Sequence, residues 1–111
     1  MNVTIIPSAE FKRQFKRLAK KYKSLASDYL DMSKELKKNP LQGDDLGGGV
    51  RKIRMAIGSK SKGKSGGARV LTLNVQINND ANVTLLTIYD KNEISNVSDD
   101  YIRWLINEVK K

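Results

Sequence analysis

The stretch that decides the fold is VRKIRMAIGSKSKGKSGGARVLTLNVQINNDANVTLLTIYDK, residues 50–91. Within its first eight residues, hydrophobic side chains at positions 53, 55 and 57 alternate with Lys52, Arg54 and Ala56, which is the two-residue period of a β-strand. Ile53 and Met55 fall on one face of this strand, and Lys52 and Arg54 fall on the other. We therefore expect this strand to be half-buried, with a basic outer face.

Two further strands follow in the same stretch. Residues 71–77 place leucine, valine and isoleucine on one parity, and residues 78–82 carry the asparagines typical of a turn. In the last strand, Leu86 and Ile88 fall on the face opposite Tyr89. Because the connections are short, we expect the three strands to pair in chain order as an antiparallel sheet.

Upstream of these strands the period changes to that of helices. A short strand, residues 3–6, ends at Pro7, and Ser8 is then a suitable N-cap for a helix. A second apolar stripe begins after Ser24 and continues until Pro40 stops it. The stripes predict a helical hairpin or one bent helix, with the apolar residues Phe11, Phe15, Leu18, Tyr22, Leu25, Tyr29, Met32 and Leu36.

A third helix follows the last strand. Ser98 is a suitable N-cap, Asp99 and Asp100 occupy the favourable first turn, and Trp104 is expected in the core. With 111 residues, the chain suits a single domain over residues 1–111. The predicted class is α+β, a small antiparallel sheet with two N-terminal helices and a C-terminal helix. We expect the helices to pack on one sheet face, which leaves the other face available for function.

The composition is basic and lacks two residue types. Lys and Arg number 21 against 12 Asp and Glu, a formal charge of +9, which favours a polyanionic partner such as nucleic acid or an acidic protein. Cys and His are both absent, which excludes disulfides, thiolate chemistry and histidine acid–base pairs. The neighbouring aspartates at residues 44–45 and 99–100 diverge and have no third ligand, so we expect no metal and no cofactor. The N-terminal apolar run is too short for a signal peptide or a membrane span, and we expect a cytoplasmic protein with no membrane partner.

Charge is also segregated along the sequence. Residues 46–79 contain no acidic residue, although a solvated surface normally mixes both signs. Because Lys52 and Arg54 share a strand face, we expect them to project together, with loop lysines beside them over one phosphate. Arg69 has the parity of Leu71, on the core side, and would reach the polar face only through a bulge or twist near the preceding glycine pair. The basic residues of this interval are Arg51, Lys52, Arg54, Lys60, Lys62, Lys64 and Arg69.

Such a cluster allows binding or catalysis. It can bind RNA through charge alone. It can also cleave RNA without histidine, because crowded positive charges lower the pKa of an amine, which then takes a 2'-hydroxyl proton while arginines stabilise the phosphorane. That reaction gives a 2',3'-cyclic phosphate and a 5'-hydroxyl. On the last strand, Tyr89 and Lys91 fall on the same strand face. Three roles are open for Tyr89: stacking on an RNA base, orienting a reacting group, or packing against the terminal helix. The basic residues of the first helix form a solvated face, or a contact with an antitoxin or the ribosome.

Several segments resemble one protein family. VRKIR at 50–54, GKSGGARV at 63–70 and LLTIYDK at 85–91, followed by VS at 97–98, closely resemble the HigB branch of the RelE/ParE toxin superfamily, and KSGGAR is the most specific part. The resemblance implies a microbial RNase-like fold and ribosome-dependent cleavage of mRNA in the A site. It also implies a toxin that is monomeric alone and is neutralised by a cognate antitoxin, in this branch usually one with a helix-turn-helix domain.

The resemblance further assigns residues to roles. It implies that the family's basic active-site positions fall on Lys52, Arg54, Lys62, Lys64 and Arg69, with Tyr89 and Lys91 on the last strand. We therefore expect Lys62, Lys64, Arg69, Tyr89 and Lys91 to be catalytic. We expect RNA binding by other basic residues of the segregated interval, namely Arg51, Lys52, Arg54 and Lys60. Two alternatives stay open. ParE-type relatives keep the fold but poison DNA gyrase by binding it, and a third possibility is an RNA-binding protein without catalysis.

Overall fold

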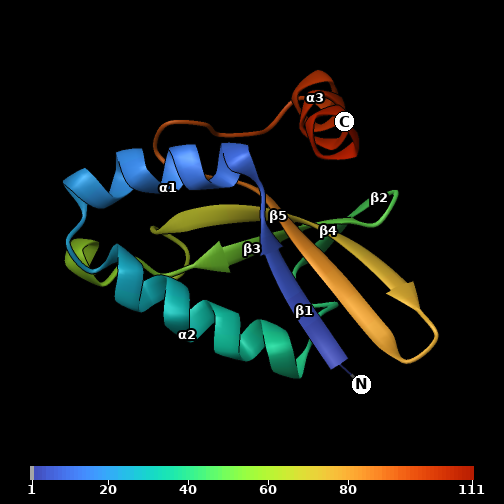
Figure 1. The fold of residues 1–111 in the computed structure, drawn as a ribbon. Coiled ribbons are helices and arrows are strands. Elements are labelled where there is room, and N and C mark those ends of the chain that lie inside the picture. Colours follow the sequence, from blue (N-terminus) through green and yellow to red (C-terminus); the bar gives the residue numbers. More distant parts are fainter. Residues whose placement is uncertain (1) are drawn as a thin grey trace.

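A computed structural model describes residues 2–111 (Figure 1). Within these residues the chain forms three α-helices, a five-stranded sheet and a short 3-10 helix, Gly58–Lys60. This arrangement confirms the predicted α+β class. The elements in chain order are β1 (Asn2–Pro7), α1 (Ala9–Lys21), α2 (Leu25–Lys38), β2 (Asp44–Gly47), β3 (Val50–Met55), β4 (Ala68–Ile77), β5 (Asp80–Asp90) and α3 (Asp99–Lys110).

The sheet is mixed rather than purely antiparallel. Its strand order is β1-β5-β4-β3-β2, and β3, β4 and β5 pair antiparallel in chain order as predicted. β1 instead pairs parallel with β5, from Asn2 opposite Asp80 to Pro7 opposite Leu85. The expectation of an antiparallel sheet is therefore wrong for β1. Local periodicity identifies a strand but does not show the direction of a partner 78 positions away.

β2 is a strand that the sequence did not predict. The stretch from Gln42 to Gly49 carries two aspartates and four glycines and was expected to be a loop. Its residues pair antiparallel with β3, with Asp44 opposite Lys52 and Asp45 opposite Arg51. All of β2 is exposed, so backbone pairing to the sheet edge, and not burial of side chains, makes it a strand.

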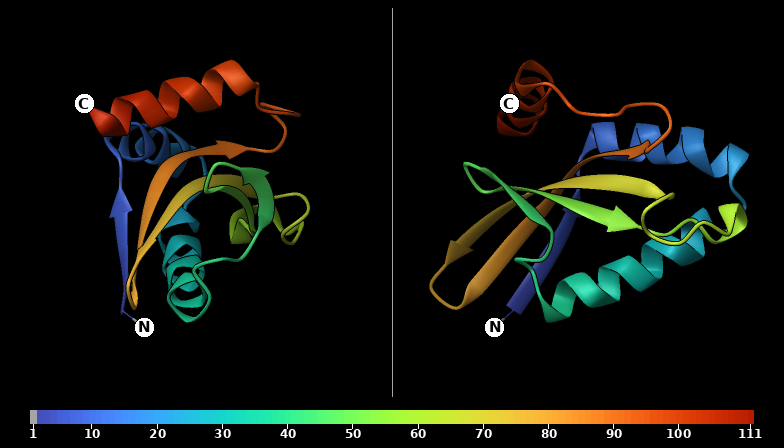
Figure 2. Two further views of the ribbon diagram at one scale, coloured as in Figure 1. Left: turned by 90° about the vertical axis from the view of Figure 1, so that its right-hand side faces the viewer. Right: turned by 180° about the vertical axis from the view of Figure 1, so that it is seen from behind.

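The helices cover both faces of the sheet. α1 and α2 form a V over one face, where residues such as Leu18, Leu25 and Leu36 build the main core with Val70 and Ile88 (Figure 1). α3 packs on the opposite face, where a smaller core contains Val50, Leu71, Leu86, Tyr89 and Leu105. In Figure 2, α3 lies above β5 and well away from α2. The expectation that all helices share one face is therefore wrong, and only part of the α3 face stays open.

Helix boundaries follow the expected capping residues. The Ser8 hydroxyl accepts a hydrogen bond from the Phe11 amide, and the Ser98 hydroxyl accepts one from the Tyr101 amide. α1 and α2 are separate helices, because the chain leaves the helical conformation at Tyr22. Within residues 2–111, no helix is long and apolar enough to cross a membrane.

A β-bulge in β5 changes which face one residue occupies. The register with β4 shifts between Leu71 and Thr72, so Leu86 has no partner while Leu85 and Thr87 do. Leu86 consequently packs in the smaller core together with Tyr89, whereas strict alternation placed these residues on opposite faces. The bulge thus turns both Leu86 and Thr87 toward α3.

Candidate functional site

Three of the predicted site residues lie side by side across the sheet. Arg54 of β3 is the register partner of Arg69 of β4, and Arg69 is the partner of Tyr89 of β5. Side chains of directly opposed residues leave a sheet on the same face, with Cβ atoms about 5 Å apart. Lys52 lies one row further along on this face. The structure therefore brings an arginine pair, a tyrosine and a lysine together on the α3 side.

Arg69 reaches this row without a bulge. It shares the parity of Leu71, as expected, but that parity belongs to the α3 face and not to the main core. Arg69 is only 8% exposed, and its guanidinium donates to backbone carbonyls: Nη1 to Lys64 and Ala68, and Nη2 to Ser65, all at 3.1 Å. Arg69 thus fixes the loop that carries the predicted lysines.

The glycine pair before β4 is required by close packing. A Cβ atom on Gly67 would lie 2.1 Å from the Met55 carbonyl oxygen, and one on Gly66 would lie 2.6 Å from the Lys62 Cβ. Both contacts are far shorter than van der Waals separation. The glycines therefore allow the loop to close directly against the end of β3.

Basic side chains converge beside the part of β3 that β2 leaves unpaired. Lys52, Arg54 and Lys64 line one depression of about 290 Å³. Arg54 and Lys64 also line a second depression of about 180 Å³, whose opposite wall is the acidic side of α2. In that wall, Glu35 Oε2 lies 3.6 Å from the Lys64 ammonium, in a pair that is mostly exposed. This convergence makes the β3 edge the best place on the sheet for a phosphate group.

Tyr89 is largely covered by α3. Its side chain is 4% exposed, and burial raises the pKa of its phenol, although the nearby Arg69 charge opposes that shift. Thr87, one row further along, is fully buried, and its hydroxyl lies 3.0 Å from the Tyr101 hydroxyl of α3. Thr87 and Tyr101 were not singled out from the sequence. The only available signal was the position of Tyr101 one turn before Leu105 on the apolar stripe of α3.

Lys60 lies apart from this group. Its ammonium is 2.7 Å from Asp90 Oδ1, and the two side chains are 8% and 2% exposed. Burial alone would raise the pKa of Asp90, but hydrogen bonds from Lys60, from the Tyr22 hydroxyl at 2.5 Å and from the Asn92 amide lower it to about 2. Tyr22 belongs to the main core, so this pair anchors the 3-10 helix on the side of α1 and α2.

The remaining predicted residues are dispersed. Arg51 donates to the Gly43 carbonyl and lies 3.7 Å from Asp45, and strand alternation places it on the face opposite Lys52. Lys62 and Lys91 are exposed, and within residues 2–111 neither forms an ion pair. The Lys91 amide donates to the Gly67 carbonyl at 3.1 Å, which places Lys91 beside the basic loop.

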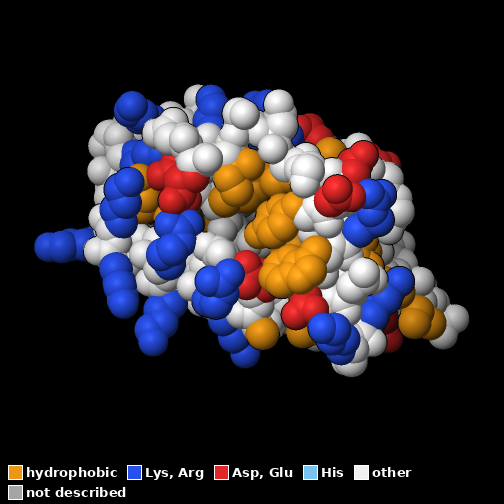
Figure 3. All heavy atoms as spheres, turned by 90° about the horizontal axis from the view of Figure 1, so that it is seen from above, with side chains coloured by type: hydrophobic (Ala, Val, Ile, Leu, Met, Phe, Trp, Pro, Cys, Tyr) orange, Lys and Arg blue, Asp and Glu red, His pale blue; other side chains and the backbone are white. Residues whose placement is uncertain are grey.

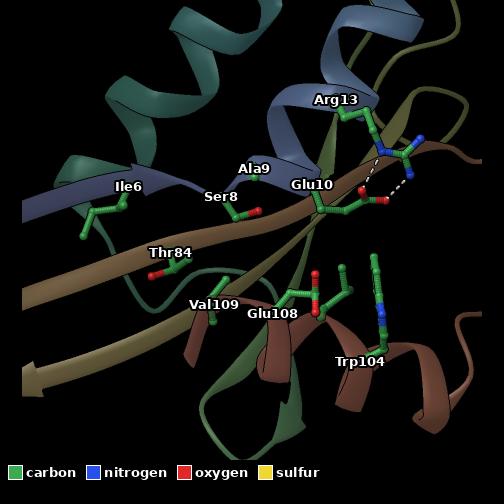
Figure 4. Close-up of a pocket in the computed structure, with 10 residues that line it drawn as sticks. Ile6, Ser8, Ala9, Glu10, Arg13, Thr84, Trp104, Glu108 and Val109 are labelled. Atoms are coloured by element: carbon green, nitrogen blue, oxygen red, sulfur yellow. Dashed lines mark hydrogen bonds and ion pairs between the residues drawn. The ribbon is translucent and has the colours of Figure 1, made fainter. Parts of the chain in front are cut away.

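One further hollow contains none of the predicted site residues. It is a groove of about 620 Å³ between α1 and α3, and Figure 4 shows Trp104 and the paired Glu10 and Arg13 on its walls. Trp104 is 44% exposed and stacks on Tyr101, so its predicted place in the core is wrong. Figure 3 looks onto this side and shows hydrophobic side chains at the centre and many basic ones to the left.

Comparison with protein families extends over almost the whole described chain. Residues 10–110 match the family model described as the RelE toxin of the RelE / RelB toxin-antitoxin system. The chain belongs to the RelE toxin family. This RelE toxin is therefore the toxin of a toxin–antitoxin system and has a cognate antitoxin as its partner. The α+β architecture, with helices on both sides of a five-stranded mixed sheet, agrees with that membership.

Proposed function

We propose that this RelE toxin is a ribosome-dependent mRNA endoribonuclease that cleaves mRNA in the A site and thereby inhibits translation. The observation that carries the proposal is the convergence of Lys52, Arg54 and Lys64 around one depression where the pairing of β2 with β3 ends, beside the Arg54–Arg69–Tyr89 row. Three cations around one small depression suit a single RNA phosphate, and Arg54 can offer it a planar donor pair.

The proposed chemistry is internal attack by a 2'-hydroxyl. An amine of the loop, from Lys62 or Lys64, takes the hydroxyl proton, and the 2'-oxygen forms a bond to phosphorus. Arg54 and Lys52 stabilise the charge of the phosphorane. The bond from phosphorus to the 5'-oxygen then breaks, and that oxygen takes a proton from a lysine ammonium, for which Lys91 is the candidate. The products are a 2',3'-cyclic phosphate and a 5'-hydroxyl.

Two residues act indirectly in this proposal. The Arg69 guanidinium donates hydrogen bonds to the carbonyls of Lys64 and Ser65, so Arg69 positions the loop and does not bind the RNA. Tyr89 is buried against α3, so it packs beneath Arg69 and does not contact the RNA. Lys60 pairs with Asp90, and Arg51 contacts Gly43 and Asp45, so both residues stabilise the fold in this proposal.

The partners follow the same reasoning. We expect the ribosome to present the mRNA, because a shallow site formed by a few cations does not by itself hold a flexible single strand in one geometry. The toxin alone is expected to be a monomer in the cytoplasm. The HigB-like segments further suggest an antitoxin with a helix-turn-helix domain.

The test is to induce the toxin in bacterial cells and map new mRNA 5' ends. A matched strain carries Arg54→Ala together with Lys64→Ala, and a control strain carries Lys110→Ala, an exposed change on α3. We expect cuts inside translated frames for the wild type and the control, and a loss of at least tenfold for the double variant. Growth arrest accompanied by DNA damage, with the mRNA left intact, would replace the proposal with gyrase poisoning. Binding to RNA without any arrest would leave only a non-catalytic RNA-binding protein.

A further inference from the structure

The Asp90 carboxylate is a buried charge at the end of β5. It accepts three hydrogen bonds: from the Lys60 ammonium at 2.7 Å, from the Asn92 amide at 3.0 Å and from the Tyr22 hydroxyl at 2.5 Å. A buried ion pair as a whole contributes little net stability, because desolvation offsets the attraction. The three bonds instead give one fixed geometry to the segments that carry the donors. We call Asp90, Lys60, Asn92 and Tyr22 the Asp90 cluster.

The Asp90 cluster joins two segments that the proposed cleavage uses. Lys60 lies near the start of the loop between β3 and β4, residues 56–67, and this loop carries the lysines proposed to act as the base. Asn92 lies in the turn that follows β5, and this turn also carries Lys91. Both segments lie at the end of the sheet where α1 and α2 meet (Figure 1). A single carboxylate oxygen, Asp90 Oδ1, accepts from both Lys60 and Asn92, so it ties the loop directly to the turn.

The turn after β5 has further anchors. The Arg17 guanidinium donates to both carboxylate oxygens of Glu93, at 2.7 and 2.8 Å, and Glu93 Oε1 accepts from the Asp90 amide at 3.3 Å. The Lys91 amide donates to the Gly67 carbonyl at the other end of the loop. In the part of the chain that the structure describes, no acidic side chain pairs with the Lys91 ammonium. Lys91 therefore combines a fixed backbone with an unpaired charge.

The proposed cleavage needs two amines in a defined relation to one phosphate. One takes the 2'-hydroxyl proton, and a lysine ammonium gives a proton to the leaving 5'-oxygen. A misplacement of about 1 Å in such an arrangement can cost roughly a hundredfold in rate. Residues 58–67 consist only of glycine, serine and lysine, a composition that does not by itself hold a lysine in place. Contacts outside the loop must therefore fix its lysines relative to Lys91.

We propose that Asp90 is a positioning residue for the cleavage reaction, which places Lys91 opposite the loop lysines so that Lys91 protonates the leaving 5'-oxygen. This inference rests on the proposed endoribonuclease function and adds to it a residue that does not touch the RNA. As the bond from phosphorus to the 5'-oxygen breaks, its electron pair stays on that oxygen, which takes a proton from the Lys91 ammonium. Asp90 and Lys60 are both buried and bonded to each other, so they act only through the loop and the turn.

The test compares two leaving groups in a reconstituted reaction. Purified full-length toxin is mixed with ribosomes programmed with a defined mRNA, which carries at the cut site either the natural 5'-oxygen or a sulfur in its place. A thiol ionises with a pKa of about 8.5, so the sulfur leaves as a thiolate without a proton donor. A toxin that lacks only its proton donor is therefore slow on the oxygen mRNA and normal on the sulfur mRNA. A toxin with a disrupted site is slow on both, and reactions without toxin give the background.

Three variants are compared with the wild type. The cluster variant, Lys60→Met with Asp90→Asn, removes the ionic link while the amide still accepts from the Tyr22 hydroxyl. Lys91→Met removes the proposed proton donor itself. Val83→Ala is the control for lost stability, because it removes buried methyl groups from the main core near the opposite end of β5. Urea unfolding sets a temperature at which all four proteins are folded, and kcat and KM are measured on both mRNAs.

We expect the cluster variant and Lys91→Met to lower kcat on the oxygen mRNA about tenfold or more, with KM within about twofold of the wild type. On the sulfur mRNA, both should come within about threefold of the wild type. Combining the cluster variant with Lys91→Met should give no further loss, because both act on the same proton transfer. Val83→Ala should cleave both mRNAs as the wild type does.

Four results would contradict these expectations in different ways. Equal slowing on both mRNAs in the cluster variant would overturn the proposal, because Asp90 would then only maintain the fold. A wild-type kcat in the cluster variant would overturn it as well. Wild-type cleavage of the oxygen mRNA by Lys91→Met would remove Lys91 as the proton donor and the role of Asp90 with it. A wild type that leaves both mRNAs intact would instead refute the proposed cleavage activity on which this inference rests.

Discussion

The buried pair of Lys60 and Asp90 makes a strong prediction about stability. Lys60→Met removes the ammonium but keeps the length of the side chain, and it leaves the Asp90 carboxylate without its counter-charge. Because the two side chains are only 8% and 2% exposed, water cannot replace the lost partner. Removing one member of a buried pair costs about 3 to 5 kcal/mol. That is a large part of the roughly 5 to 15 kcal/mol by which small domains are stable.

The assay is urea unfolding at pH 7 followed by far-UV circular dichroism. The matched control is the double variant Lys60→Met with Asp90→Asn, which removes both charges while the amide still accepts from the Tyr22 hydroxyl. We expect the double variant to recover most of the loss, because a buried pair as a whole contributes little net stability. A cost below about 1 kcal/mol for Lys60→Met alone would refute this reasoning. Such a value would mean that water solvates the Asp90 carboxylate in the folded protein.

Three further predictions follow from other contacts. The pKa of Asp90 is lowered from 3.8 to about 2, so its contribution is fully present above about pH 5 and is lost as the pH falls through 2; unfolding titrations should show a loss of about 2 kcal/mol between pH 7 and pH 2, and a wild type with no more acid sensitivity than Asp90→Asn would contradict this. Gly67→Ala brings a Cβ to 2.1 Å from the Met55 carbonyl, so the free energy of unfolding should fall by more than about 2 kcal/mol, and an unchanged urea midpoint would disagree with the packing. Tyr101→Phe leaves the buried Thr87 hydroxyl without a partner, which should cost about 1 kcal/mol, and a Tm equal to that of the wild type would count against this bond.

Periodicity and capping predicted the elements with local signals. Ser8 and Ser98 cap α1 and α3, and Pro40 follows the end of α2 as expected. The alternation around Ile53 and Met55 likewise predicted β3 and its buried face. These features depend on neighbours a few positions away, which the sequence shows directly.

Features that depend on distant contacts were not predictable. β2 lacks strand-forming side chains and exists because β3 offers it an edge. Trp104 was expected in the core because it is a large aromatic residue of α3, but it lines the groove between α1 and α3, whereas its neighbour Leu105 is buried against the sheet.

The candidate site likewise contains residues that local sequence patterns predicted and residues whose positions depend on distant contacts. Lys52 and Arg54 were expected together because they alternate on one strand, and the structure places both at one depression. Arg69 was assigned to the core side because a second, smaller core under α3 was not foreseen. Lys60 looked like one more loop cation, since its partner Asp90 lies 30 positions away and its proximity arises only from the fold.

The most direct test of the proposed activity is a reconstituted cleavage reaction. Purified toxin is mixed with ribosomes programmed with a defined mRNA, and the termini of the products are identified, with the Arg54→Ala and Lys64→Ala double variant and ribosome-free RNA run in parallel. We predict cleavage in the A-site codon that requires the ribosome, gives a 2',3'-cyclic phosphate and a 5'-hydroxyl, and falls at least tenfold in the variant. Intact mRNA on ribosomes that bind the wild-type toxin, or equal cleavage by the variant, would contradict the assignment of an RNA-cleaving site to the β3 edge.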